Sequence, residues 1–335
     1  MDPGILIPVS GYGGIERLID LYAQEYKRQG HQVELLITAG SKVEGCLVHP
    51  FGKPGFPPKK ADALLAIPKA WKFLLSNHER FDLIHSFGRL AYLIPVLNRS
   101  VKKMMTYQRE ITARNINYIN RLPHKNLFFT GCSADLLSRG QLSGNWSAIH
   151  NGIDFSAYTG TINLSAEAPL IFLGRIEKIK GCHTAIAVAK ATGSQLVIAG
   201  NISSLPEEIA YFEETIKPQI DGKQIKYIGQ VNDVQKNEWL GKSKALLMPI
   251  EWNEPFGIVM IEAMACGTPV IAFTLGSVAE VVEEGVTGFK VTNENEMIAA
   301  IKHLETFDRA ACRLRAAERF DVKIIAKQYL DFVGA

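Results

Sequence analysis

Residues 251–272 read EWNEPFGIVMIEAMACGTPVIA, and the fold can be worked out from this stretch. The apolar run after Gly257 predicts a short helix over residues 258–265. Pro269 cannot continue that helix, and the apolar residues 270–273 then predict a buried strand. A helix that feeds a fully apolar strand is typical of a parallel sheet with helices on both faces.

The same alternation of short apolar runs and amphipathic stretches continues along the whole chain. Helical periodicity is clearest over residues 14–28 and 61–75. Repeated strand–helix units predict an α/β protein with two doubly wound, Rossmann-like domains that face a central cleft. The predicted strands are residues 5–9, 33–38, 82–85, 103–106, 127–130, 170–173, 195–199, 225–227, 245–249 and 270–273.

The length of 335 residues also fits two domains of ordinary size. Residues 151–169 are rich in Asn, Ser, Thr, Gly and Ala without periodicity, which favours a linker. We therefore expect an N-terminal domain over residues 1–155 and a C-terminal domain over residues 165–318. Residues 319–335 are expected to form a helix that packs back on the N-terminal domain.

Composition narrows the class of protein further. With 47% hydrophobic and 21% charged residues, the chain is typical of globular proteins. It shows neither the start of a signal peptide nor a run of about 18 apolar residues. Its five cysteines are scattered and form no CxxC pair, so we expect neither disulfides nor a zinc site. These features predict a cytoplasmic protein.

Basic residues gather in the first half of the chain. Residues 1–160 hold 19 Lys and Arg against 12 Asp and Glu, whereas the remainder holds 18 against 22. A basic half fits an anionic partner, which is a nucleic acid, a phospholipid surface or a phosphorylated substrate. The basic residues are dispersed and no nucleic-acid motif accompanies them, so a nucleic-acid-binding module is the remote alternative and we expect no nucleic-acid partner.

Two polar clusters follow predicted strands, where ligands bind in open α/β sheets. GRIEKIKG, residues 174–181, carries Arg175 and Lys180, two cations that suit a pyrophosphate. Glu254 and Glu262 flank the start of the helix over residues 258–265, and carboxylates there suit sugar and ribose hydroxyls. The alternatives are a solvated turn for the cations and an exposed helical face for the acids.

A glycine-rich turn, GYGG at residues 11–14, precedes the first predicted helix. Glycines there let backbone N–H groups approach an anion or a sugar at a helix N-terminus. The dinucleotide fingerprint is not met, because Glu16 stands where its third glycine belongs. A purely structural tight turn is the alternative.

Three blocks of the sequence resemble glycosyltransferase family 4, whose members are retaining transferases of GT-B fold. They are GYGGIER, GRIEKIKG, and the two glutamates Glu254 and Glu262 with the following GTPVIA and GVTGF. HNGID, residues 150–154, is similar to the domain junction of that family. The blocks are spread over most of the chain.

The resemblance implies that the C-terminal domain binds a nucleotide-sugar donor and the N-terminal domain binds an acceptor. It implies that Arg175 and Lys180 contact the diphosphate, Glu262 the ribose, and Glu254 the donor sugar. Glu254, Arg175 and Lys180 are thus the predicted catalytic residues. The other predicted donor-binding residues are Gly13, Gly14, Val231, Phe256, Gly257 and Ile258.

One position departs from the family pattern. Many members place a histidine after the fourth N-terminal strand, whereas this chain has Gln108, which cannot act as an acid or a base. Candidates on the acceptor or sugar side are therefore Gln108 itself, Arg109, Glu110 and His85. A core role is the alternative for His85.

No Asp-x-Asp motif occurs, so we expect no metal and no cofactor, with Arg175, Lys180 and helix N–H groups meeting the diphosphate charge. The expected reaction is transfer with retention from a nucleotide-diphosphate sugar, with UDP as the expected base, to a hydroxyl of a glycan, lipid or small molecule. A GT-B nucleotide-sugar epimerase or a sugar phosphorylase is the alternative.

Residues 57–75, PPKKADALLAIPKAWKFLL, interleave lysines with leucines and an aromatic residue. A basic amphipathic helix of this kind can rest on an anionic membrane, here the inner membrane surface. The alternative is a helix that packs its apolar stripe on the N-terminal sheet and leaves its lysines in water.

Overall fold

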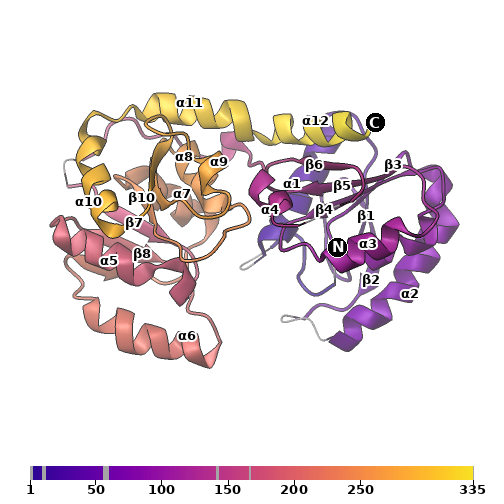
Figure 1. Ribbon diagram of the computed structural model, residues 1–335, viewed down its shortest axis with the longest axis horizontal. Coiled ribbons are helices and arrows are strands. Elements are labelled where there is room, and N and C mark those ends of the chain that lie inside the picture. Colours follow the sequence, from indigo (N-terminus) through magenta and orange to yellow (C-terminus); the bar gives the residue numbers. More distant parts are fainter. Residues whose placement is uncertain (1–2, 10–12, 56–59, 141–142, 166, 335) are drawn as a thin grey trace. The chain divides into compact units, whose positions relative to one another are not determined.

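The computed structural model describes residues 3–9, 13–55, 60–140, 143–165 and 167–334 (Figure 1). The chain divides into two compact units: unit 1 is Met1–Ile153 with Val322–Ala335, and unit 2 is Asp154–Asp321. These boundaries differ from the expected 155, 165 and 319. Most of the segment expected to be a linker, residues 154–169, belongs to unit 2, where the Thr161 N–H donates to the Cys266 carbonyl (3.0 Å).

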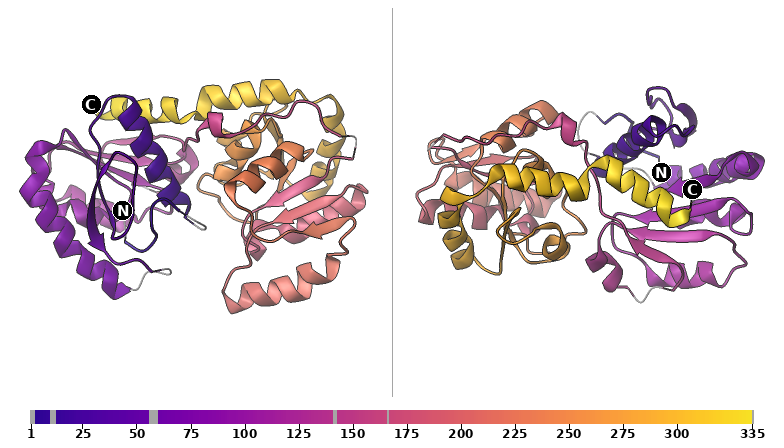
Figure 2. Two further views of the ribbon diagram at one scale, coloured as in Figure 1. Left: turned by 180° about the vertical axis from the view of Figure 1, so that it is seen from behind. Right: turned by 90° about the horizontal axis from the view of Figure 1, so that it is seen from above.

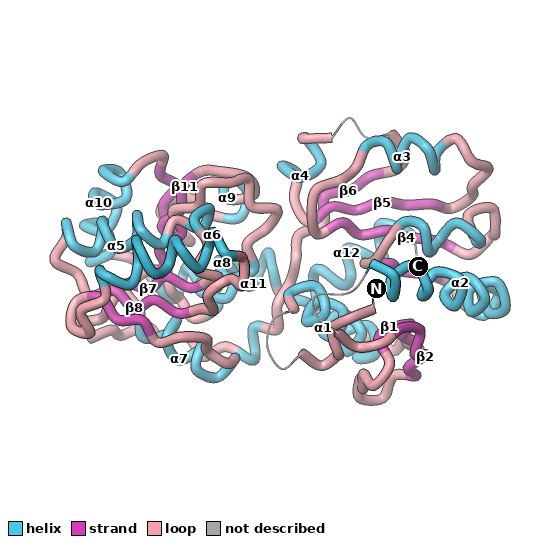
Figure 3. The backbone as a smooth tube through the Cα atoms, turned by 90° about the horizontal axis from the view of Figure 1, so that it is seen from below, coloured by secondary structure: helices cyan, strands magenta, loops and turns pink. Residues whose placement is uncertain are grey.

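Unit 1 contains parallel strands and helices. The strands are β1 (Glu34–Thr38), β2 (Leu47–Gly52), β3 (Leu83–Ser86), β4 (Lys102–Tyr107), β5 (Leu127–Gly131) and β6 (Trp146–Ala148). The helices are α1 (Gly14–Arg28), α2 (Lys60–Asn77), α3 (Ala113–Asn120), α4 (Ala134–Ser138) and α12 (Val322–Val333). β1 pairs with β2, and a second sheet has the order β3-β4-β5-β6, of which Figure 3 shows β4, β5 and β6 side by side.

The predicted strand over residues 5–9 is wrong, because the structure has no strand there. Pro8 has no N–H to give to a ladder, so the segment is tied to its neighbours by isolated bonds. The Ile7 N–H donates to Ser41 Oγ (3.0 Å), and the Ile7 carbonyl accepts from the Lys42 N–H (2.7 Å). Ile7 is still buried, although the segment around it forms no regular secondary structure.

The C-terminal helix α12 belongs to unit 1, where it contacts α1 (Figure 2). The Val322 N–H donates to the Ile153 carbonyl (2.9 Å), which ties the start of the helix to the end of the N-terminal segment. The rings of Tyr329 and Tyr22 then meet edge to face, with centroids 5.4 Å apart. Two segments that are far apart in the sequence thus share one core.

Unit 2 is a regular doubly wound domain. Its strands are β7 (Leu170–Leu173), β8 (Leu196–Ala199), β9 (Ile225–Tyr227), β10 (Leu246–Met248), β11 (Val270–Phe273) and β12 (Gly288–Val291). Its helices are α5 (Cys182–Ala191), α6 (Pro206–Tyr211), α7 (Asp233–Lys242), α8 (Ile258–Ala265), α9 (Val278–Val281), α10 (Glu294–Lys302) and α11 (Arg309–Phe320). All strands are parallel in the order β12-β11-β10-β7-β8-β9.

Candidate functional site

The strand order of unit 2 reverses at β7, which has β8 on one side and β10 on the other. Such a reversal opens a crevice at the carboxyl ends of the two strands, and ligands bind there in open α/β sheets. A cavity of ≈ 220 Å³ lies at this point. Five of the predicted donor-binding residues line it: Arg175, Lys180, Glu254, Gly257 and Ile258.

Glycines bring the loops around this cavity into close contact. A Cβ at Gly200 would lie 1.8 Å from the Gly174 carbonyl oxygen, so the chain after β8 packs directly on the loop that carries Arg175. Gly181 has φ +74°, and a Cβ there would lie 1.9 Å from the Pro249 oxygen. Only glycine fits these two approaches, because any side chain would displace backbone.

Both predicted cations face carboxylates in this structure. Lys180 Nζ lies 2.5 Å from Glu254 Oε2 and 4.6 Å from the centroid of the Trp252 ring. The Trp252 indole N–H donates to the same carboxylate oxygen (3.0 Å). Arg175 Nη1 lies 2.6 Å from Oε1 of Glu177, which is buried. An entering diphosphate would therefore compete with Glu254 for Lys180.

The loop that carries Glu254 is hydrogen-bonded to the residue that precedes α9. The Ser277 N–H donates to the Glu254 carbonyl (2.9 Å), and the Ser277 hydroxyl donates to the Phe256 carbonyl (2.8 Å). Gly257, with φ +73°, then begins α8 without a side-chain cap. The first N–H groups of α8 therefore keep their positive partial charge at the wall of the cavity, where they can meet an anion.

Glu262 lies on the second turn of α8 and is buried outside the lining of the cavity. Its Oε1 accepts from the Tyr158 hydroxyl (2.9 Å) and lies 2.5 Å from Lys236 Nζ. Burial lowers the pKa of Lys236, but Glu262 and Asp233 outweigh that effect and raise it overall. Burial and the neighbouring Glu262 raise the pKa of Tyr158. No motif or periodicity in the sequence pointed to Tyr158 or Lys236.

Two other predicted donor-binding residues also lie outside the cavity lining. Phe256 is buried, and its ring lies edge to face with Phe320 at a centroid distance of 6.1 Å. Val231 is half-buried on the loop after β9. That loop is joined to the chain after β8, where the Gly200 N–H donates to the Gly229 carbonyl (2.8 Å).

The glycine-rich turn of unit 1 is described only in part, because residues 10–12, Gly11 among them, lie outside the described residues. Gly13 has φ +149° and begins α1 without a side-chain cap. A Cβ at Gly14 would meet none of the described residues within 4 Å. Glu16 is buried, and burial raises its pKa against the opposing effects of its backbone hydrogen bond and the charge of Arg109.

His85 lies in β3 and is half-buried in unit 1, where it lines a further cavity of ≈ 140 Å³. Its Nε2 lies 2.7 Å from Thr106 Oγ1, and its Nδ1 lies 3.3 Å from the Tyr26 hydroxyl. The ring packs against Phe87 and Tyr329, with centroids 4.3 and 4.9 Å away. Burial lowers the pKa of His85 to about 3, so the ring is neutral. His85 therefore stays a candidate on the acceptor or sugar side, with a core role as its alternative.

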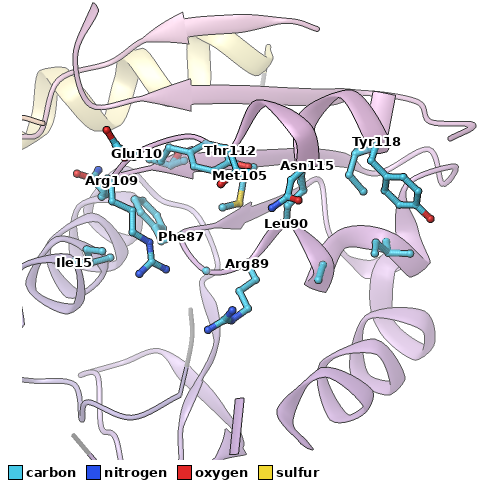
Figure 4. Close-up of a pocket in the computed structure, with 17 residues that line it drawn as sticks. Ile15, Phe87, Arg89, Leu90, Met105, Arg109, Glu110, Thr112, Asn115 and Tyr118 are labelled. Carbon is cyan, nitrogen blue, oxygen red and sulfur yellow. The ribbon is translucent and has the colours of Figure 1, made fainter. Parts of the chain in front are cut away.

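Gln108 and Arg109, which follow β4, line a separate cavity of ≈ 390 Å³ within unit 1 (Figure 4). The Gln108 amide is fixed by Asn151, because each side chain donates to the other's oxygen at 2.7 Å. Glu110 lines the same cavity. Three of the four candidates for the acceptor side thus come together, and His85 is not among the residues that line this cavity.

Two family models match the chain: residues 12–157 match Glycosyltransferase Family 4 and residues 164–318 match Glycosyl transferases group 1. The phosphatidyl-myo-inositol mannosyltransferase of Propionibacterium freudenreichii is 34% identical over 238 residues, which are 64% of this chain and 58% of that protein. The glycogen synthase of Mycobacterium tuberculosis is 28% identical over 178 residues, 51% of this chain and 42% of that protein. The chain therefore spans about half the length of these curated relatives.

Solved structures share the fold at lower identity. A glycosyltransferase from Rickettsia africae superposes with a TM-score of 0.77 at 19% identity, covering 99% of this chain and 96% of that one. Anabaena HepE in complex with UDP-glucose superposes with a TM-score of 0.72 at 18% identity, covering 99% of each chain.

Proposed function

This chain belongs to glycosyltransferase family 4, with the GT-B fold, and on that premise we propose that it transfers a sugar from a nucleotide-diphosphate sugar to a hydroxyl acceptor. The observation that carries the proposal is the cavity at the strand reversal of unit 2. Two cations, an uncapped helix N-terminus and the carboxylate of Glu254 meet there. This set of groups suits a ligand that is anionic at one end and hydroxylated at the other.

The proposed chemistry is transfer with retention. The bond between the anomeric carbon and the diphosphate oxygen breaks, and its electron pair leaves with the nucleotide. Arg175, Lys180 and the N–H groups of α8 meet that developing charge. The acceptor hydroxyl forms the new bond to the anomeric carbon on the face that the nucleotide leaves, and its proton passes to the leaving phosphate. Glu254 holds hydroxyls of the donor sugar. Glu262 is assigned to the ribose hydroxyls, which would have to compete with Tyr158 and Lys236 for its carboxylate.

Replacing the two cations tests this assignment. We expect Arg175→Ala and Lys180→Ala each to lower kcat/KM by roughly 100-fold, in line with the loss of a preorganised donor to a developing anion. Lys178→Ala is the matched control, because Lys178 is exposed on the same loop and does not line the cavity. Unchanged turnover in the first two variants would end the assignment. Formation of a new sugar isomer from the donor alone would assign an epimerase instead.

We propose UDP as the donor base, a choice motivated by the UDP-glucose complex of Anabaena HepE. A thermal-shift screen of UDP-, GDP- and ADP-sugars tests it, because 100-fold saturation over Kd stabilises a protein by about 2.7 kcal/mol. We propose in addition that transfer needs no metal, since side chains and N–H groups meet the diphosphate charge. Turnover that survives EDTA supports this, and loss of turnover that Mg²⁺ restores would contradict it.

We also propose that α2 rests on an anionic membrane surface. One face of the helix buries Ala66 and Ala70 in unit 1, whereas Leu64 and Leu65 are 66% and 68% exposed. Two lysines of the same helix are exposed as well, Lys69 and Lys72. Exposed leucines next to lysines suit the boundary between acyl chains and anionic headgroups. No helix in the described part of the chain is long and apolar enough to cross a bilayer, so this contact is peripheral.

Vesicle sedimentation tests the membrane contact. We expect the wild type to sediment with vesicles that contain anionic lipid, and the double variant Leu64→Ser/Leu65→Ser to stay in the supernatant. Leu314→Ser is the matched control, because Leu314 is a 63% exposed leucine of unit 2. Equal sedimentation of both variants would refute a role for α2.

A further inference from the structure

We propose that Trp252 is a positioning residue, which holds the Glu254 carboxylate in place for the donor sugar once Lys180 has moved to the diphosphate. The proposal rests on the proposed function, because it concerns the donor site described there. It adds a residue that lies outside the described lining of the cavity and outside the predicted donor-binding set.

The backbone around Trp252 is fixed on both sides. The Glu251 N–H before it donates to the Ile179 carbonyl (2.8 Å), in the loop after β7. Gly276 packs against the backbone after it, because a Cβ at Gly276 would lie 2.4 Å from both the nitrogen and the oxygen of Glu254. A loop held in this way leaves Glu254 free mainly to rotate about its side-chain bonds. The orientation of its carboxylate therefore depends on the side chains that donate to it.

Two side chains donate to Glu254, and both meet the same oxygen, Oε2. Lys180 Nζ lies 2.5 Å from this oxygen, and the Trp252 indole N–H donates to it at 3.0 Å. Within the described part of the chain, no hydrogen bond or ion pair reaches Oε1. A carboxylate oxygen can accept two hydrogen bonds, so Oε1 is the oxygen that can receive the hydroxyls of a bound sugar.

A bound diphosphate removes Lys180 from Glu254 under the proposed function. The Glu254 side chain is only 12% exposed, and a carboxylate that loses its cation in such a place needs other donors. The indole N–H of Trp252 remains on Oε2, because both residues belong to one loop whose backbone is held. The sugar hydroxyls donate to Oε1, so each oxygen of the carboxylate keeps a partner.

The Trp252 ring also contacts Lys180 before a ligand enters. Lys180 Nζ lies 4.6 Å from the ring centroid, which is within the range of a cation–π contact. The ammonium group thus lies against both the ring and the Glu254 carboxylate. Its move to a diphosphate changes the charge next to the indole, and the fluorescence emission of Trp252 should report that move.

Paired titrations with UDP and UDP-glucose test the proposal, because UDP carries the diphosphate without the sugar. Trp252→Phe keeps a ring beside Lys180 but removes the N–H. Calorimetry should show its Kd for UDP-glucose raised at least about 5-fold, as expected for a lost hydrogen bond to a charged group, with Kd for UDP within about twofold. If the nucleotide screen selects GDP or ADP, that nucleotide and its glucose conjugate replace this pair.

Two further variants serve as controls for this titration. Trp239→Phe is the matched control, because Trp239 is also a half-buried tryptophan of unit 2 and does not line the cavity. It should leave both Kd values within about twofold. Trp252→His keeps a ring N–H and should recover part of the affinity for UDP-glucose. Equal weakening of UDP and UDP-glucose in Trp252→Phe, or no change in either, would overturn the proposal.

A double-mutant cycle shows whether Trp252 acts through Glu254. Glu254→Ala alone should raise Kd for UDP-glucose. Adding Trp252→Phe should raise it no further, because the acceptor of the indole N–H is already gone. Circular dichroism and thermal melting establish that each variant is folded. Additive losses in the double variant would contradict a role through Glu254.

The cycle also separates this proposal from the proposed function. If Glu254→Ala binds UDP-glucose as tightly as the wild type does, the assignment of Glu254 to the donor sugar fails, and the role of Trp252 fails with it. If Glu254→Ala loses affinity and Trp252→Phe does not, only the role of Trp252 fails.

Tryptophan emission tests the movement of Lys180 in the otherwise intact protein. UDP should change the emission of the wild type and of Trp239→Phe, and this change should be absent in Trp252→Phe. An identical change in Trp252→Phe and the wild type would contradict a move of Lys180 away from the Trp252 ring.

Discussion

The two cavities differ in how their cations are balanced. In unit 2, Lys180 and Arg175 already face Glu254 and Glu177, so the site is close to neutral before a ligand enters. In unit 1, the acid that lines the cavity with two arginines is mostly exposed and lies near Arg139 instead. An anion that enters the cavity of unit 2 therefore has to displace Glu254 from Lys180.

The two units also differ in how their loops are held. Glycines of unit 2 place backbone directly against backbone, whereas in unit 1 side chains make the ties, as in the pair Gln108 and Asn151. Two backbone segments in direct contact leave no room for an added atom. A hydrogen bond between two side chains, in contrast, can be weakened gradually by substitution.

Gly181→Ala should have the largest effect. Its φ of +74° and the 1.9 Å approach to the Pro249 oxygen together should cost about 3 kcal/mol or more of the unfolding free energy. Gly193→Ala is the matched control, because Gly193 has φ +66° but nothing within 4 Å of the added Cβ, so about 1 kcal/mol is expected. Urea unfolding measures the unfolding free energy of both variants. Equal losses would show that the contact with Pro249 contributes nothing.

Lys236→Met should be the next most damaging change, because it leaves Glu262 buried without its cation. Removing one partner of a buried ion pair lowers the unfolding free energy by about 3 kcal/mol, so unit 2 of this variant should unfold at a lower urea concentration than in the wild type. Lys217→Met, which breaks the exposed pair with Glu213, should cost less than about 1 kcal/mol. If the two variants unfold at the same urea concentration, Lys236 does not stabilise Glu262 in the folded chain.

Sequence alone predicted unit 2 well because its sheet is regular. The strands at residues 170–173, 225–227 and 270–273 and the helix at 258–265 were predicted with the bounds they have. The loops after β7 and β10 were predicted to carry the chemistry, and residues of both line one cavity. The part of the cluster that was missed, Tyr158 with Lys236, joins segments whose contact depends on tertiary packing and leaves no local pattern.

Unit 1 was predicted less completely, and the reasons are local. Its first predicted strand is irregular because Pro8 cannot donate a hydrogen bond, although the apolar pattern around it is strand-like. β2 contains a proline and β6 is three residues long, so neither stood out in the sequence. Arg89 was not singled out, because a lone arginine after a short strand has no signature until the neighbouring strand brings Arg109 to the same cavity.

The pH dependence of unit 1 should give the smallest effect. Burial lowers the pKa of His85 to about 3, below its value in an unfolded chain, so the unfolded state binds the extra proton. The stability from the neutral ring is fully present above about pH 6.5 and is lost as pH falls towards 3, by at most about 1.4 kcal/mol per pH unit. His85→Phe should flatten that decline. Urea unfolding at a series of pH values measures it, and parallel curves for both proteins would contradict the buried neutral ring.

Calorimetric titration with UDP, GDP and ADP tests the donor cavity most directly. The cavity of unit 2 should bind at least one of the three at one site per chain, with the affinity reduced in Lys180→Ala and preserved in Lys178→Ala. Absence of binding heat for all three nucleotides, or equal affinity in Lys180→Ala and the wild type, would contradict a diphosphate held by Lys180 at the strand reversal.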